Sequence, residues 1–120
     1  MVVLYHYTTE HGAAGIDEAK IIYKSDQDNR DAFWGNGVYF TMLPPHISKQ
    51  IIVQNNWDGR LPLRIVERYI RQGKIDFVIT VHIPDNDSRL KQCNDRDGRD
   101  IWVYLDDVDL RRFRHSIERL

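Results

Sequence analysis

The sequence predicts an α+β protein, with strands near both ends of the chain and helices between them. Four segments rich in β-branched and aromatic residues predict strands, at residues 2–9, 38–41, 76–83 and 100–105. Between them, apolar residues recur at helical spacing, and the total comes to four or five strands and three or four helices. A chain of 120 residues fits a single domain, residues 1–120.

The first strand is the segment "VVLYHYTT" at residues 2–9. Side chains alternate between the two faces of a strand. One face then carries Leu4, His6 and Thr8, and the other carries Val3, Tyr5 and Tyr7. The imidazole and the hydroxyl of His6 and Thr8 are therefore expected to be neighbours.

A helix over residues 10–19 follows, because Thr9 can cap its first turn. Its buried stripe is expected to be small and to consist of Ala13, Ile16 and Ala19. Residues 23–37 then form a long polar segment without periodicity, which is a candidate binding loop. Gly35 and Gly37 end this loop, and the strand 38–41 carries Tyr39 near its centre.

The middle of the chain predicts two helices. Pro44 and Pro45 suit a turn before a helix at residues 46–56. Its buried side is expected to hold Ile47 and Ile51, with Val53 as a further candidate. Pro62 opens a second helix that Gly73 ends. The buried face of this helix is expected to hold Leu63, Val66 and Ile70.

The last third of the chain begins with its most apolar strand, residues 76–83, which we expect inside a sheet. A second long polar loop covers residues 84–99, and the strand 100–105 places Asp100, Trp102 and Tyr104 on one face. The end of the chain leaves two interpretations open. Helical spacing relates Leu110, Phe113, Ile117 and Leu120, whereas "DVDL" at residues 107–110 favours a strand.

Composition disfavours several classes of function. The 17 Lys and Arg residues nearly balance the 18 Asp and Glu residues, so there is no strong signal for nucleic-acid binding. Cys93 is the single cysteine and cannot form an internal disulfide, which favours a reducing compartment. No apolar run is long enough for a bilayer, and no signal peptide is expected before a strand that starts at Val2. We expect a cytoplasmic protein, although an effector delivered into a target cell would have the same features.

Common catalytic motifs are missing from the sequence. The five histidines never stand three or four residues apart, and no Cys-x-x-Cys occurs, so no metal site is expected. The sequence also lacks the Gly-x-Ser-x-Gly elbow, the phosphate-binding P-loop and a complete Gly-x-Gly-x-x-Gly. What remains are polar positions on three separate strands: His6 with Thr8, Tyr39, and Asp100.

Three segments that carry these positions, "YHYTT", "GNGVYFT" and "RDIWVYL", resemble the signature strands of ADP-ribosyltransferases. The closest resemblance is to the toxin-type transferases with a His-Tyr-Asp signature, and a more distant one is to poly-ADP-ribose polymerases. It extends over about residues 3–105. It implies split antiparallel β-sheets with flanking helices around a cleft for NAD, which serves as co-substrate without a metal.

The resemblance also implies roles for individual residues. His6 would hydrogen-bond the adenosine ribose of NAD, the Tyr7 backbone would hold the nicotinamide amide, and Thr8 would support the nicotinamide ribose. Tyr39 would stack on the nicotinamide ring, and Asp100 would hold the ribose hydroxyl beside the bond that breaks. We therefore expect His6, Tyr39 and Asp100 to form the catalytic group.

General chemistry agrees with these roles. A cationic pyridinium ring is stabilised by an electron-rich aromatic face, and a carboxylate stabilises the positive charge that develops on the sugar. Gly37 would let the backbone pass close to the ligand. Trp34, in the loop before it, would close over the bound nucleotide as a lid.

Several alternatives remain open at this point. Asp100 is one carbon shorter than the Glu of many relatives, and the acidic role could instead belong to Asp97, Asp106, Asp107 or Asp109. The acceptor of ADP-ribose could be a macromolecule, a small molecule or, in an NAD glycohydrolase, water. A non-catalytic nucleotide- or protein-binding module would keep the same fold. If the domain is a toxin, the resemblance implies an immunity or antitoxin protein as partner.

Overall fold

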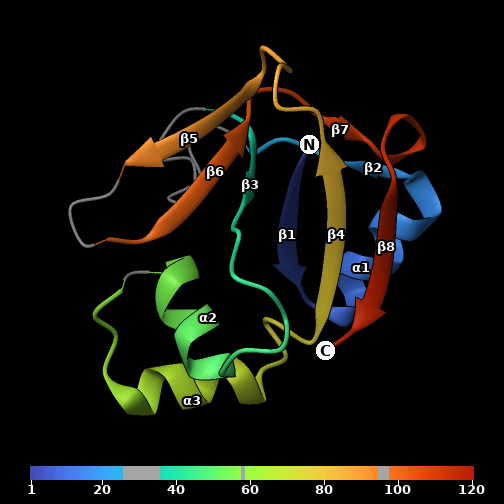
Figure 1. Ribbon diagram of the computed structural model, residues 1–120. Coiled ribbons are helices and arrows are strands. Elements are labelled where there is room, and N and C mark those ends of the chain that lie inside the picture. The colour runs from blue at the N-terminus through green and yellow to red at the C-terminus, as the bar shows by residue number, and fades with distance from the viewer. Residues whose placement is uncertain (26–35, 58, 95–97) are drawn as a thin grey trace.

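The computed structural model describes residues 1–25, 36–57, 59–94 and 98–120. This part of the chain folds into eight strands, three α-helices and one short 3₁₀ helix, as Figure 1 shows. In chain order they are β1 (Val2–Thr8), α1 (Glu10–Ala19), β2 (Ile21–Ile22), β3 (Val38–Phe40), α2 (Lys49–Trp57), α3 (Leu63–Arg71), β4 (Phe77–Ile83), β5 (Leu90–Asn94), β6 (Asp100–Tyr104), β7 (Val108–Asp109), the 3₁₀ helix η1 (Leu110–Arg112) and β8 (His115–Arg119).

The strands form two three-stranded sheets and one short pair, and every pairing is antiparallel. One sheet has the order β1-β4-β8, the other has the order β3-β6-β5, and β2 pairs with β7. The two larger sheets meet where Tyr5 of β1 and Thr41 exchange main-chain hydrogen bonds of 2.8 and 3.0 Å. Figure 1 shows β3 at the edge of its sheet, between β6 and β1. The predicted α+β class with split antiparallel sheets is confirmed.

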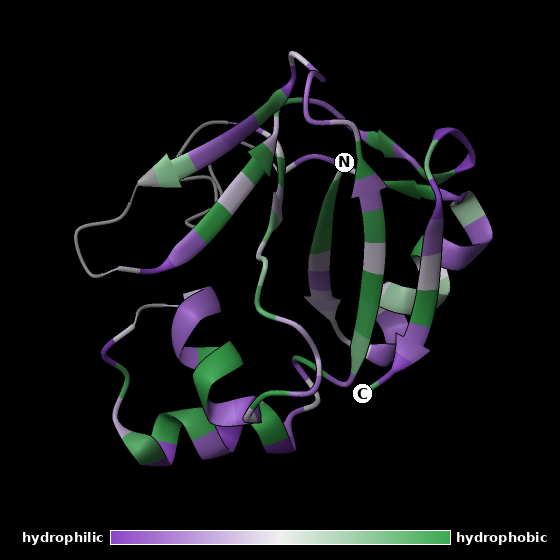
Figure 2. Ribbon diagram, in the orientation of Figure 1, coloured by the Kyte–Doolittle hydropathy of each residue, from purple (hydrophilic) through white to green (hydrophobic). Residues whose placement is uncertain are grey.

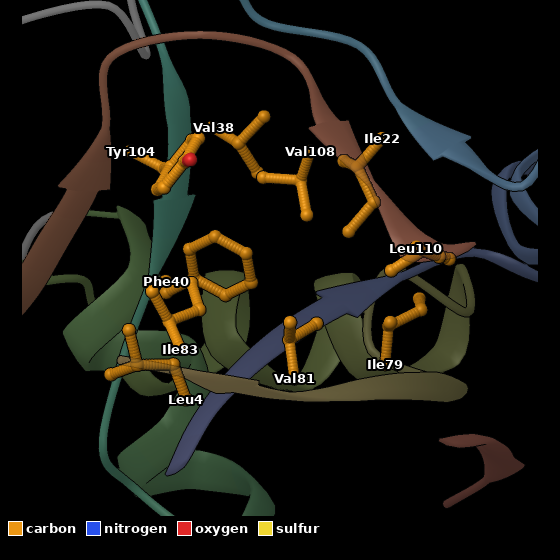
Figure 3. Close-up of a cluster of buried hydrophobic side chains, with 10 residues drawn as sticks. All are labelled: Leu4, Ile22, Val38, Phe40, Ile79, Val81, Ile83, Tyr104, Val108 and Leu110. Atoms are coloured by element: carbon orange, nitrogen blue, oxygen red, sulfur yellow. The ribbon is translucent and has the colours of Figure 1, made fainter. Parts of the chain in front are cut away.

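A first core cluster packs the two sheets together (Figure 3). Its buried side chains come from both large sheets and from the β2-β7 region: Leu4, Ile22, Val38, Phe40, Ile79, Val81, Ile83, Tyr104, Val108 and Leu110. Burial of these apolar groups is the main stabilising contribution at the junction between the sheets. The side chains that position the two sheets relative to each other are thus aliphatic and aromatic.

A second core cluster lies on the other face of the β1-β4-β8 sheet, against α2 and α3. Its buried members are Tyr7, Ile52, Val53, Val66, Ile75 and Val78. Leu4 belongs to the first cluster and Tyr7 to the second, so the two faces predicted for the first strand are confirmed. In Figure 2, the hydrophobic residues of α2 lie in the middle of the helix, with hydrophilic residues at both ends.

Local signals predicted α1 and β4 well. The helix α1 covers residues 10–19 as expected, and the Thr9 side chain accepts a 3.0 Å hydrogen bond from the Gly12 N–H. Strand β4 lies between β1 and β8, which confirms that the most apolar strand is inside a sheet. The end of α3 is followed by Gly73 with a φ of 75°, as a glycine after a helix end commonly has.

The buried faces of α2 and α3 differ in part from the prediction. Ile51 is 54% exposed, whereas its neighbour Ile52 is fully buried. Successive residues of a helix are rotated by about 100°, so a run of three apolar residues does not show which of them faces the core. Leu63, at the start of α3, is 63% exposed, because the first residue of this helix extends past the edge of the second cluster.

One expectation about the second half of the chain was wrong, and the structure decides between the two interpretations of its end. The segment 84–99 was expected to be a loop, but it contains β5, whose polar sequence pairs with β6. The helical spacing through Ile117 and Leu120 was also misleading, because β8 is a strand paired with β4. The alternative of a strand in "DVDL" is confirmed by β7. Both β5 and β8 are edge strands, and pairing with a buried neighbour compensates for their weak apolar pattern.

Candidate active site at the junction of the two sheets

Tyr39 occupies the centre of β3, the edge strand that lies next to β1 of the other large sheet. Its neighbours Val38 and Phe40 are both buried in the first core cluster. Because side chains alternate along a strand, the Tyr39 ring lies on the opposite face and is partly exposed. The ring therefore lies outside the packed core between the sheets.

The His6 imidazole crosses from β1 to β3. Its Nδ1 lies 2.9 Å from the main-chain oxygen of Tyr39, and the ring contacts the edge of Phe40 with 5.8 Å between ring centroids. A carbonyl oxygen can only accept a hydrogen bond, so Nδ1 is the protonated nitrogen of the neutral ring. Burial lowers the pKa of His6 below its ordinary value of 6.5, and the carbonyl of Tyr39 opposes this shift more weakly. Near neutral pH, Nε2 is consequently a hydrogen-bond acceptor.

We expect this histidine to make the protein less stable in mild acid. The unfolded chain takes up a proton at His6 near pH 6.5, whereas the folded chain resists it, because burial lowers the pKa of the ring. The stabilising contribution of neutral His6 is present above pH 6.5 and is lost as the pH falls below it, by at most about 1.4 kcal/mol per pH unit. Urea unfolding at pH 7.5 and 5.5 measures this effect. His6→Asn, which keeps a donor to Tyr39, should show a smaller acid loss; an equal loss in both proteins would contradict the assignment.

Tyr7 places its side chain and its main chain in different environments. The phenol is buried in the second cluster and donates a 2.7 Å hydrogen bond to the Leu43 carbonyl, and burial raises the pKa of Tyr7. In an antiparallel strand, alternate residues direct their N–H and C=O groups to the same edge. Tyr5 bonds Thr41 with both groups, so the main chain of Tyr7 also points to the β3 edge of β1.

At Tyr7, however, β1 and β3 have separated. Pairing in the same register would set Tyr7 opposite Tyr39, but the Tyr5–Thr41 bridge is isolated among the described residues. The Tyr39 carbonyl is taken by His6 instead. The N–H and C=O of Tyr7 thus face the point where the two sheets separate, next to the strand that carries Tyr39.

Thr8 is placed less favourably for contact with a ligand. Its Oγ1 lies against the backbone of Gly12 in the first turn of α1, so close that a Cβ at position 12 would overlap with it. Thr8 is adjacent in sequence to the Tyr7 edge, but its hydroxyl lies on the face that α1 covers. Its predicted role at the nicotinamide ribose stays a prediction.

Asp100, the first residue of β6, is bound to the other end of the same β3 segment. Its Oδ1 accepts hydrogen bonds from the Met42 N–H at 3.0 Å and from the Thr41 hydroxyl at 3.3 Å. Its Oδ2 makes no hydrogen bond to another described residue, and none of the ion pairs in the described ranges involves this carboxylate. One carboxylate oxygen is therefore held in place, and the second makes no bond within the described residues.

The four residues 39–42 thus connect all three predicted catalytic side chains. Tyr39 belongs to this segment, His6 bonds its first residue, and Asp100 bonds its last two. Residues 4–112, which include all three, match the family described as HYD1 signature containing ADP-ribosyltransferase. The chain belongs to this toxin-type ADP-ribosyltransferase family. No curated protein and no solved structure matches it.

In this ADP-ribosyltransferase, the other acidic candidates within the described residues are bonded to other segments. Asp106 pairs with Arg89 at 3.4 Å, Asp107 accepts a 2.8 Å bond from the Lys24 N–H, and Asp109 holds Arg111. All three follow the C-terminal end of β6, whereas Asp100 begins that strand. Asp97 lies outside the described residues. Among the described candidates, Asp100 is the one bonded to the Tyr39 segment.

Gly37 of the transferase is buried against β6. A Cβ added there would lie 2.5 Å from Val103 Cγ2 and 2.6 Å from the Tyr104 carbonyl oxygen, so the space beside it is filled by protein. This contact explains the need for glycine without a ligand. Trp34 and Gly35, the expected lid and the other loop glycine, lie outside the described residues.

We expect Gly37→Ala to lower the free energy of unfolding of the transferase by about 1–3 kcal/mol, because the methyl group would push β3 away from β6. Denaturant unfolding measures the loss. Gly15→Ala is a matched control, since nothing lies within 4 Å of the corresponding Cβ in α1. Equal stability of the two variants would show that the approach of β3 to β6 is not tight.

Two residues of this site were not predicted from the sequence. Thr41 and Asn55 are the buried polar residues among those described, and both bond Asp100. No three His, Cys, Asp or Glu side chains in the described ranges are grouped so as to hold a metal ion. No helix within the same ranges has the length and apolar character needed to cross a membrane.

Proposed function

We propose that the protein consumes NAD, cleaving the bond between nicotinamide and ribose and transferring ADP-ribose to an acceptor. The observation that carries this proposal is the connection of His6, Tyr39 and Asp100 through residues 39–42, at the separation of the two sheets. Membership in an ADP-ribosyltransferase family supports the class of reaction. The choice of NAD rests on the chemistry of four groups: the Tyr7 main chain, the Tyr39 ring, the His6 imidazole and the Asp100 carboxylate.

The groups near Tyr7 and Tyr39 fit the nicotinamide end of NAD. A carboxamide offers one acceptor and two donors. The Tyr7 main chain offers the complementary N–H and C=O, on an edge where no described strand pairs with it at that position. The Tyr39 ring, on the partly exposed face of β3, offers an aromatic surface for the cationic pyridinium. Together they would bind the ring in one orientation.

The other two groups fit the ribose hydroxyls. His6 has an acceptor nitrogen at Nε2, because its Nδ1 hydrogen is used by the Tyr39 carbonyl. The Oδ2 oxygen of Asp100 makes no bond within the described residues and could accept one from a ribose hydroxyl. As the bond to nicotinamide breaks, positive charge develops on the sugar. A fixed carboxylate beside the sugar stabilises this transition state more than it stabilises the bound substrate, so the barrier falls.

The direct test is to mix the purified protein with NAD and follow the release of nicotinamide. Release above the uncatalysed rate is the expected result. A protein that binds NAD without releasing nicotinamide would be a non-catalytic binding module, and the proposal would be wrong. Labelled NAD incubated with a cell lysate then separates transfer from hydrolysis: label on a macromolecule or small acceptor indicates a transferase, and free ADP-ribose alone indicates an NAD glycohydrolase.

An immunity or antitoxin protein as partner stays a prediction from the family resemblance. Co-purification of a neutralising protein that stops nicotinamide release would support it. Delivery into a target cell as an effector likewise stays a prediction.

A further inference from the structure

Asn55 stands on α2, yet its side chain takes the place of a β-strand beside Asp100. Directly after β6, the Leu105 N–H bonds the carbonyl of Arg89, which precedes β5. The odd-numbered residues of β6 therefore direct their main-chain N–H and C=O groups toward β5, and the even-numbered residues direct theirs toward β3. The last β3–β6 pair is Phe40 with Trp102. At Asp100, two residues earlier in β6, the β3 strand has ended.

The Asn55 amide supplies both hydrogen bonds that β3 no longer makes. Its Oδ1 accepts the Asp100 N–H at 2.6 Å, and its Nδ2 donates to the Asp100 carbonyl at 2.9 Å. The Met42 N–H, which is no longer engaged by the Asp100 main chain, bonds the Asp100 carboxylate instead. The position of this carboxylate thus depends on a side chain from a helix.

A third bond closes the arrangement around the carboxylate. Asn55 Nδ2 also donates to the Thr41 hydroxyl at 3.1 Å, and that hydroxyl in turn donates to Asp100 Oδ1. Asn55 is 9% exposed and Thr41 is 2% exposed, so water has little access to these bonds. The Asn55 carbonyl oxygen accepts a 2.8 Å bond from Arg99 Nε, which ties α2 to the residue before Asp100.

We propose that Asn55 is a positioning residue that holds the Asp100 carboxylate in its reactive position. This role rests on the proposed function, in which Asp100 acts on the ribose. A carboxylate that stabilises charge in a transition state must be held to within about 0.5 Å, and its supporting contacts set that precision. Because the Asp side chain is short, the position of its main chain largely sets the position of its carboxylate. Asn55 fixes that main chain on the edge that β3 leaves unpaired.

Gln54 provides a matched control on the same helix. Its amide makes the same pair of bonds to a main chain, donating to the Leu61 carbonyl at 2.7 Å and accepting the Leu61 N–H at 2.8 Å. Leu61 precedes α3 and packs against the second core cluster, and within the described residues Gln54 makes no hydrogen bond to residues 39–42 or to Asp100. Removal of either amide leaves two main-chain groups without partners, so the two losses of stability should be similar.

The experiment compares Asn55→Leu with Gln54→Leu. It also compares Asn55→Asp with Gln54→Glu, which keeps the test valid if a leucine variant does not fold. We expect both Asn55 variants to lose on the order of 10- to 100-fold in kcat for nicotinamide release, since misplacement by about 1 Å costs this much. Their KM for NAD should stay within about threefold, because the Tyr7 edge and the Tyr39 ring are unchanged. The Gln54 variants should keep the wild-type kcat at a temperature well below their melting points.

The outcomes distinguish the two proposals. If the wild type releases nicotinamide and the Asn55 variants match the Gln54 variants in kcat, the positioning role is wrong and the proposed function stands. A rise in KM without a fall in kcat would also contradict positioning of Asp100. If the wild type releases no nicotinamide, the proposed function is wrong and the positioning role is wrong with it.

Discussion

Asp100→Asn is expected to reduce the rate of nicotinamide release by about 10³-fold while the protein stays folded. Removal of one preorganised group that stabilises transition-state charge costs about 10²- to 10³-fold in other enzymes, and here the group carries a full charge opposite a developing cation. The amide keeps the shape of the carboxylate and removes its charge. The effect should therefore appear in kcat more than in KM.

The fold should survive this change because the contacts of Asp100 that hold the structure do not need the charge. The amide oxygen of Asn can accept the Met42 N–H and the Thr41 hydroxyl as Oδ1 does. The main-chain bonds to Asn55 are unaffected. A melting temperature close to that of the wild type would confirm that the loss of activity is chemical.

Asp106→Asn is the control for this prediction. It removes the same charge from a carboxylate beyond the far end of β6, where Asp106 pairs with Arg89. This variant should release nicotinamide at the wild-type rate. Wild-type activity in Asp100→Asn, or an equal loss in both variants, would refute Asp100 as the catalytic acid.

Ile79→Ala is expected to lower the free energy of unfolding by about 3–4 kcal/mol, within the range for removal of a large aliphatic side chain from a packed core. Ile79 is fully buried in the first core cluster (Figure 3). It pairs with His6 across β1 and β4. Because typical domains are stable by only about 5–15 kcal/mol, this single change removes a large share of the stability. Urea denaturation with an unchanged m-value measures it.

Ile51→Ala is the matched control for the core prediction. Ile51 is 54% exposed on α2, so the same truncation should change stability by less than about 0.5 kcal/mol. This comparison also tests the corrected orientation of α2, because the sequence pattern predicted Ile51 to be buried. A loss at Ile51 as large as that at Ile79 would contradict the described face of the helix.

Predictions from the sequence succeeded where the cause is local. The Thr9 side chain reaches the Gly12 N–H three residues away, so the start of α1 follows from adjacent residues. The strand signal in β4 comes from its own apolar side chains. In contrast, β5 and β8 are mostly polar, and their strand conformation depends on pairing with distant segments. Their own sequences carry little sign of that pairing.

The sequence by itself determined the α+β class, the family resemblance and the three signature strands, because each of these is encoded in short runs of neighbouring residues. Only the tertiary structure decided which acidic residue is bonded to the segment that carries Tyr39 and what holds it there. Asn55 is 45 positions from Asp100, and a lone asparagine on a helix carries no signal of such a contact. The reason is physical: hydrogen bonds between distant segments depend on how the sheets and helices pack, and that packing is set by the buried core as a whole.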